Sequence, residues 1–328
     1  MADVGNIAGP GDLHPDRFPD TFDWPEVVDW LVRRNGSLAA TAELLAAQRR
    51  HRENVDSIER ALRRLRTATG DGGTWGARVI EAFGLPDDVR ARLAWMGTYH
   101  SRFTDLPTPV CADLLRFWDR PAIRRSAEAV WLDLGRTGLH LRRRETEAAA
   151  ALLEQVDGPR LPPEARVEAA LVGSFLVSRS DPDRSASLLD EAETHLSTLD
   201  PSDDRACLHA RWVDQVAYRL NLPRDRTPDY TAAEALYRTI DQGGPPFARC
   251  RRHNGLGWSL HRQGRRAEAL AEARASVQVA GDAGHLRLRA MALGLLAKVA
   301  EGGEAESAAA RGREIAARLA DDLLTARF

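Results

Sequence analysis

The chain has 328 residues, of which 43% are hydrophobic and 29% charged, and its formal net charge is −2. This composition is typical of a globular protein with a real core, and the overall charge predicts no polyanion partner. Lys298 is the only lysine among 46 basic residues, so the abundance of arginine is a bias of composition and predicts no binding function by itself.

Nothing in the sequence predicts a membrane segment or an export signal. No apolar run approaches the roughly 20 residues that cross a bilayer. The first residues lack the basic start and the apolar core of a signal peptide. The cysteines Cys111, Cys207 and Cys250 are odd in number and far apart. We therefore expect three free thiols in a cytoplasmic protein that has no membrane partner.

The N-terminal quarter predicts a leader and a helical bundle. Residues 1–22 are rich in Gly, Pro and Asp, which indicates a flexible leader. Residues 23–74 predict three helices. The first runs from Trp24 to Asn35-Gly36, and the second follows a cap at Ser37. The third, NVDSIERALRRLRTA, places apolar residues inward and arginines outward.

Two runs of this bundle, NGSLAATAELL and SIERALRRLR, together resemble a bacterial helix-turn-helix domain. TGDGGTWG would then form a tight hairpin or wing. The intervening QRRHREN is longer than a compact motif needs, so one long helix over 38–68 stays open, as does a bundle that only packs or dimerises. The resemblance implies contact with duplex DNA, and residues 24–68 hold nine arginines against six acids. The candidate DNA-binding residues are Arg49, Arg50, Arg52, Arg60, Arg63 and Arg64.

Residues 75–122 predict an aromatic-rich helical joint with short helices at 75–83, 86–96 and 109–117. His100, Ser101 and Asp105 could be mistaken for a hydrolase triad. No strand-turn-helix surrounds the serine to expose it as a nucleophile, so we expect no catalytic role. Together with Arg102, these residues should anchor a loop that is buried between two domains.

From residue 123 to residue 328 the helices come in about five pairs. The breaks between pairs are rich in Pro and Gly. Helical hairpins that cannot bury their apolar faces alone predict a right-handed α-solenoid, so the expected fold class is all-α. The expected pairs are 123–142 with 145–156, 163–178 with 183–198, 203–220 with 229–241, the two helices of 247–281, and 285–300 with 303–321.

Residues 247–281 carry the clearest repeat pattern. Leu256-Gly257 lies in the first helix, Gly264 at the turn and Ala269 in the second helix. This spacing resembles a tetratricopeptide repeat (TPR), although His253 and Leu260 stand where the family has Trp and Tyr. The resemblance covers roughly 123–321. It implies that Gly257 and Ala269 meet, and that the first helix of each pair lines a concave groove.

Charge is divided along this part of the chain. Residues 181–206 hold eight acids against two arginines, and residues 247–290 hold nine arginines against three acids. Arginine and asparagine on the groove would suit the carboxylates and backbone amides of a peptide, whereas a solvated basic face is the alternative. The candidate partner-binding residues are Arg249, Arg252, His253, Asn254, Arg287 and Arg289.

The sequence holds no Gly-rich phosphate loop, no Cys-x-x-Cys and no His-Glu-x-x-His, so we expect no enzyme, cofactor or metal site. The leading hypothesis is a non-enzymatic regulatory protein that binds a protein or peptide in the groove. The alternative is a DNA-binding transcription regulator that uses residues 24–68, with the solenoid as sensor or dimerisation domain. It resembles, by domain order alone, peptide-sensing regulators that join a helix-turn-helix to TPRs. A homodimer is left open.

Overall fold

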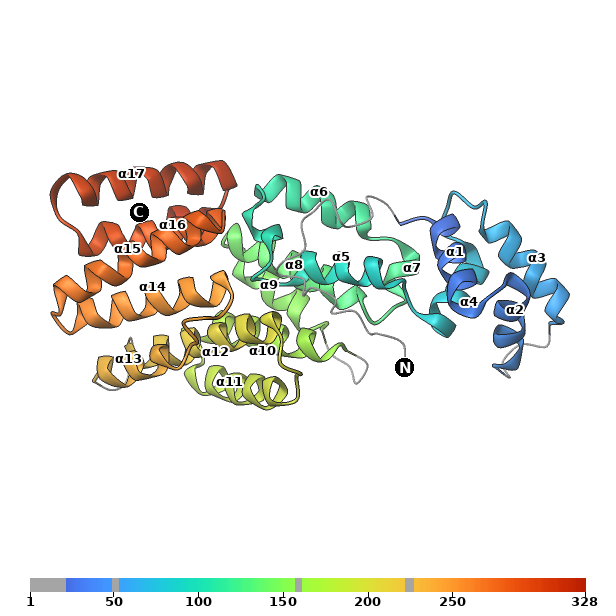
Figure 1. Ribbon diagram of the computed structural model, residues 1–328, viewed down its shortest axis with the longest axis horizontal. Coiled ribbons are helices and arrows are strands. Elements are labelled where there is room, and N and C mark those ends of the chain that lie inside the picture. Colours follow the sequence, from blue (N-terminus) through green and yellow to red (C-terminus); the bar gives the residue numbers. More distant parts are fainter. Residues whose placement is uncertain (1–21, 49–52, 157–160, 222–226) are drawn as a thin grey trace.

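The structure is a computed structural model that describes residues 22–48, 53–156, 161–221 and 227–328. Within these ranges every regular element is a helix and no strand is present, so the expected all-α class is confirmed (Figure 1). None of the described helices is both long enough and apolar enough to cross a membrane. Three candidate DNA-binding residues, Arg49, Arg50 and Arg52, lie outside the described ranges.

The N-terminal bundle lies at one end of the molecule (Figure 1). Polar side chains at three helix starts accept a backbone N–H and so replace a missing intrahelical bond: Asp23 in α1, Ser37 in α2 and Asn54 in α3. The bundle consists of α1 (Trp24–Asn35), α2 (Leu38–Ala47), α3 (Val55–Leu65) and α4 (Gly73–Phe83).

Two expectations for this bundle are corrected. A single helix over 38–68 is excluded because Asn54 is extended, with φ −74° and ψ 157°. The hairpin or wing at TGDGGTWG is wrong because α4 begins at Gly73. The glycines there make room for the indole of Trp24, which donates to the Gly70 carbonyl at 2.9 Å. A Cβ on Gly76 would lie 2.4 Å from that ring.

The joint links the bundle to the rest of the chain through one continuous core. The buried rings of Trp95, Phe103 and Trp118 belong to the same hydrophobic cluster as Trp24 of the bundle. At Gly97 the backbone of α5 approaches α8 so closely that a Cβ would lie 2.4 Å from the Trp131 carbonyl. The elements of the joint are α5 (Asp87–Gly97), the 3₁₀ helix η2 (Arg102–Asp105), α6 (Thr108–Trp118) and α7 (Pro121–Arg124).

Five helical hairpins follow, and one of the expected helices is interrupted. The helix expected over 123–142 is interrupted after Arg124, where the Ser126 hydroxyl donates to the Ile123 carbonyl at 2.7 Å and competes with the helix. The hairpins are α8 (Ala129–Arg142) with α9 (Thr146–Leu153), α10 (Pro163–Val177) with α11 (Pro182–Ser197), α12 (Asp203–Asn221) with α13 (Tyr230–Arg238), α14 (Pro246–Arg262) with α15 (Arg266–Asp282), and α16 (Leu286–Val299) with α17 (Gly302–Leu319).

The fourth hairpin has the close helix approach that its sequence pattern predicts. Gly264 turns the chain with φ +77°, a conformation that favours glycine. A Cβ on Gly257 would lie 3.3 Å from the Ala269 carbonyl and 2.8 Å from the side chain of Leu295. Gly257 therefore admits both its own partner helix α15 and α16 of the next hairpin.

The hairpins pack in chain order, and the array then returns to its beginning. Helices α10, α12, α14 and α16 contact one another in sequence, while α18 (Asp322–Thr325) contacts α8. Arg142 of α8 donates to the Leu319 carbonyl at 2.9 Å, and Thr108 of α6 donates to the Ala320 carbonyl at 2.7 Å. The last hairpin thus meets both the first hairpin and the joint.

Candidate functional site

A tyrosine surrounded by arginines stands where the joint meets the hairpin array. Tyr99, between α5 and η2, reaches the first helices of three successive hairpins. Its hydroxyl accepts from Arg251 of α14 at 2.9 Å and also from Arg287 of α16. The guanidinium of Arg211 from α12 lies 4.5 Å from the ring centroid, a cation–π distance.

These charges change the acidity of the phenol. Burial raises the pKa of Tyr99, but the charges of Arg287, Arg251, Arg211 and Arg327 outweigh it and lower that pKa to about 7. An ordinary tyrosine has a pKa of about 10. The phenol of Tyr99 therefore titrates near neutral pH instead of near pH 10.

Carboxylates complete the charge balance of this centre. Arg251 pairs with Asp214 of α12 at 2.9 Å, and Arg211 pairs with Glu168 of α10. Arg287 pairs with Asp321 at 2.8 Å through its Nε, and the side chain of Asp321 is fully buried. Removing one partner of a buried ion pair leaves the other charge buried and uncompensated, which is strongly destabilising. We therefore expect these pairs to stay formed in the folded protein.

The loop after Tyr99 is anchored by buried polar side chains, as the sequence predicts. Ser101 is fully buried and its hydroxyl donates to the Trp95 carbonyl at 2.5 Å. His100 contacts Asp204 at 3.0 Å. Because the serine donates to a carbonyl and the histidine contacts a different carboxylate, these residues form no serine–histidine relay.

Asp105 fixes the end of this loop against α16. Its carboxylate accepts the backbone N–H of Arg287 at 2.8 Å and the Nε–H of Arg102 at 2.8 Å, and it lies 3.2 Å from the Nδ1 of His285. Arg102 in turn donates to the carbonyls of Ala283 and Gly284 at 2.9 and 2.8 Å. The inner surface at the start of α16 is therefore already occupied by the chain itself.

The six candidate partner-binding residues do not gather in one accessible place. Arg287 is 6% exposed and is engaged by Tyr99 and Asp321, and Arg252 is 5% exposed, so the expectation that they face a ligand from an open surface is corrected. The reason is that the joint packs against the first helices of the hairpins. A neighbour of Arg252, His253, points to a different side of α14, where it contacts Glu272 of α15 at 2.6 Å.

The remaining three candidates do not form a common surface with these. The Nε of Arg289 is buried without a hydrogen bond partner, and its guanidinium passes near Gly281 of α15. The Oδ1 of Asn254 is likewise buried without a partner. Arg249 lies three residues before Arg252 and therefore on the same side of α14, about 60° away around the helix, whereas Asn254 points about 160° away from Arg252. The four candidates on α14 thus do not all share one face.

On the N-terminal bundle, α3 has a basic outer face. It buries Ile58, Ala61, Leu62 and Leu65 and exposes its arginines. Arg63 pairs with Glu59 on the same helix at 2.5 Å. Arg60 donates only to the Asp56 carbonyl and the Ser57 hydroxyl of its own helix, and within the described residues neither Arg60 nor Arg64 has a carboxylate partner.

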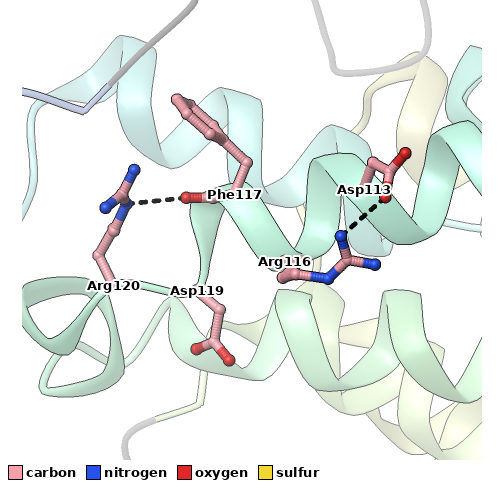
Figure 2. Close-up of a pocket in the computed structure, with 5 residues that line it drawn as sticks. All are labelled: Asp113, Arg116, Phe117, Asp119 and Arg120. Atoms are coloured by element: carbon pink, nitrogen blue, oxygen red, sulfur yellow. Dashed lines mark hydrogen bonds and ion pairs between the residues drawn. The ribbon is translucent and has the colours of Figure 1, made fainter.

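A shallow depression of about 320 Å³ lies at the end of α6 (Figure 2). Its polar groups satisfy one another: Arg116 donates to Asp113 at 2.9 Å, and Arg120 donates to the Phe117 carbonyl at 2.9 Å. Asp119, the fifth lining residue, accepts from arginines of α7 and α8. Because these donors and acceptors are already paired, the depression offers a ligand little to bind, and the sequence did not single it out.

The described residues contain no cluster of His, Cys, Asp or Glu with the makings of a metal site. Cys111, Cys207 and Cys250 are buried and form no disulfide with one another, and burial raises the pKa of the Cys111 thiol to about 11. A thiol with so high a pKa is a weak nucleophile at neutral pH, so Cys111 is a packing residue.

Sequence reasoning missed the arginine centre, although one signal was available. Glu168, Arg211, Arg251 and Arg287 recur at intervals of 43, 40 and 36 residues, one in each first helix from α10 to α16. A charged residue that recurs at the repeat period indicates one shared position on successive hairpins.

No protein-family model, curated protein or solved structure matches this chain.

Proposed function

We propose that this protein is a non-enzymatic regulator that binds duplex DNA through the outer face of α3. The observation that supports the proposal is the pair Arg60 and Arg64, exposed one turn apart with no carboxylate partner among the described residues. Arginines that are already paired must leave that partner before they contact a phosphate, whereas these two need not.

The placement of α3 suits this role. Figure 1 shows α3 at the end of the molecule that is remote from the hairpin array. Its main helix contacts are with α1, α2 and α4, which cover the apolar side. The arginine face is therefore open to a rod-shaped ligand, and a helix is narrow enough to enter the major groove of B-form DNA.

The test measures binding of the full chain to a fluorescently labelled duplex of mixed sequence at several salt concentrations. Wild type should bind at low salt, with an affinity that falls linearly on a log–log plot. The double variant R60Q/R64Q should lower the magnitude of that slope by about 0.9 for each phosphate that is no longer neutralised. Thermal unfolding of both proteins should agree, because exposed, unpaired arginines contribute little to stability.

The matched control is R311Q/R318Q, which removes two exposed arginines from α17 at the other end of the molecule. It changes the net charge equally and should leave the slope at the wild-type value. An equal reduction of the slope in both variants would mean that binding follows net charge alone. Absence of binding by wild type at low salt would remove the DNA-binding function altogether.

A partner site on the hairpin array is the second candidate function. Many of the basic residues of 247–290 form ion pairs within the chain. Arg265 pairs with Glu234 and Glu268, and Arg274 pairs with Glu304. A partner would therefore have to use residues other than the predicted arginine set. One group of exposed side chains favours this second function.

A further inference from the structure

Three aromatic side chains occupy equivalent positions on successive hairpins. Phe175 lies seven residues after Glu168, Tyr218 seven after Arg211, and Trp258 seven after Arg251. Seven residues make nearly two helical turns, so each aromatic residue lies on the same face as its charged counterpart and about 10 Å further along the helix. We call Phe175, Tyr218 and Trp258 the aromatic row.

Hydrogen bonds between the helices bring the members of the aromatic row side by side. Gln215 of α12 donates to the Leu171 carbonyl of α10 at 3.0 Å. Asn221 of α12 contacts Ser259 of α14 at 3.3 Å. The first hydrogen bond lies just before the positions of Phe175 and Tyr218, and the second lies just after Tyr218 and Trp258. The aromatic residues of α10, α12 and α14 therefore lie at about the same height along their helices. The aromatic row therefore runs across three neighbouring helices.

The aromatic row is exposed, which is unusual for rings of this size. Phe175 is 44% exposed and Tyr218 is 43% exposed, and Trp258 is partly exposed. All three lie on first helices, and Tyr99 with its arginine partners covers the same face of α12 and α14 two turns earlier. The joint thus covers one half of this face and leaves the aromatic half open.

One end of the aromatic row carries unpaired positive charge. The Lys298 ammonium lies 5.6 Å and the Arg262 guanidinium 6.0 Å from the Trp258 ring centroid. Arg262 contacts the Tyr230 hydroxyl, and within the described residues neither cation has a carboxylate partner. The opposite end, at Phe175, begins the region of acidic residues from 181 to 206.

The side-chain amide of Asn254, which could bind the backbone of a ligand, lies beside the aromatic row. Asn254 precedes Trp258 by one turn of α14, and its Oδ1 is buried without a hydrogen bond partner. The equivalent residue of α12, Asp214, is satisfied by Arg251 and by the Tyr237 hydroxyl. A buried acceptor that lacks a donor costs free energy. The Asn254 residue as a whole is only partly buried, so its amide would turn outward to accept a ligand N–H and remove that cost.

We propose that the aromatic row binds a peptide segment of a partner protein. Apolar side chains of the peptide pack on Phe175, Tyr218 and Trp258, a backbone N–H donates to Asn254, and a carboxylate pairs with Lys298 and Arg262. This proposal gives the second candidate function a site and a ligand class, and it does not depend on DNA binding by α3.

The charge pattern favours a peptide over a single-stranded nucleic acid. Nucleic acid strands stack on aromatic rings too, but they need positive charge along the whole path of the phosphates. Among the described residues, the cation–π contacts of the aromatic row are at Trp258, and the region of acidic residues from 181 to 206 follows Phe175 at the other end. A chain with one acidic end fits this distribution, whereas a uniformly charged strand does not.

The experiment selects phage-displayed random decapeptides on the full chain and measures the affinity of each enriched peptide. Enriched sequences should combine apolar residues with an acidic group. The variant F175S/Y218S should weaken them at least tenfold, and K298Q should weaken acid-bearing peptides more than versions with Asn in place of Asp. The matched control is V110S/F117S, which removes two equally exposed apolar side chains, 43% and 41%, from α6.

Each outcome decides the proposal. Enrichment that survives F175S/Y218S, or that disappears equally in V110S/F117S, would place the peptide elsewhere and overturn it. Failure to enrich any peptide, or displacement of enriched peptides by oligo(dT), would overturn a peptide as the occupant. Duplex binding by R60Q/R64Q is measured on the same preparations, so that failure of the DNA function and failure of the peptide site are seen separately.

Discussion

At the scale of single residues, Tyr99 is a phenol whose surroundings lower its pKa to about 7. Three guanidinium groups contact its ring or hydroxyl, while Asp214 and Asp321 pair with Arg251 and Arg287. An ionised phenol in this position adds a negative charge among the arginines. Because the joint carries Tyr99 and the hairpins carry the arginines, this charge also ties the two parts together.

The lowered pKa of Tyr99 predicts a pH-dependent stability with a definite sign. The phenol releases its proton near pH 7 in the folded protein and near pH 10 when unfolded. The unfolded state therefore binds more protons between these values, so the contribution grows with pH above about 7 and is lost as pH falls through 7. The free energy of unfolding of wild type, relative to Y99F, should rise by up to about 1.4 kcal/mol per pH unit.

Urea unfolding of both proteins at about pH 6 and about pH 8.5 checks this expectation. Wild type should show tyrosinate absorbance at about pH 8.5, and Y99F should remove it. If the stability difference between the two proteins is the same at both pH values, the phenol is not ionised by its arginine neighbours.

At the scale of the element, the seam between α14 and α15 depends on small residues. Ala269 is fully buried, and a Cβ on Gly257 would lie only 3.3 Å from its carbonyl oxygen, which is tighter than most contacts of a Cβ atom. Larger groups at such a seam force the helices apart or the side chains out of their preferred rotamers. The close packing of this hairpin therefore requires small side chains at Gly257 and Ala269 as well as apolar contacts.

Ala269→Leu should lower the free energy of unfolding by about 1–3 kcal/mol through overpacking. The control is Ala267→Leu, two residues earlier on α15, where the side chain is exposed. Leucine and alanine have similar helix propensities, so the control should change stability by a few tenths of a kcal/mol. Equal melting temperatures for the two variants would remove Ala269 from the interhelical seam.

Helices were the most predictable elements, because their boundary signals are local. Pro163, Pro182 and Pro246 each open a helix at its first position, and Gly264 and Gly284 each turn the chain with a positive φ. The run TGDGGTWG misled the prediction because a glycine-rich stretch favours a turn. Here it serves the packing of Trp24, a contact over 46 residues that no local pattern contains.

At the scale of the whole molecule, the contacts that join distant segments could not be predicted from the sequence. The hairpin periodicity indicated which helices pair, and the polar residues of 100–105 indicated a buried loop. Neither indicated that this loop would lie against α16, nor that Arg287 would be taken up by Tyr99 and Asp321. An arginine looks the same in a sequence whether it faces solvent or a carboxylate from another element.

Asp321 is the residue on which the return of the array to its beginning depends. It is fully buried, pairs with Arg287 of α16 at 2.8 Å and lies at ion-pair distance from Arg142 of α8 at 3.3 Å. Its other oxygen accepts the Leu324 N–H at the start of α18. One carboxylate thus connects the first hairpin, the last hairpin and the C-terminal helix.

Asp321→Asn keeps the size of the side chain but removes the carboxylate that two buried arginines share, which should cost about 3–5 kcal/mol. The control is Asp322→Asn at the neighbouring exposed position, which should leave stability within about 0.5 kcal/mol of wild type. Because the missing charge joins α8 to α16 and α18, hydrogen exchange should accelerate first in those helices and stay unchanged in α1–α3. Acceleration spread evenly over the chain would show that the molecule unfolds as one unit, and that Asp321 does not specifically hold the two ends of the array together.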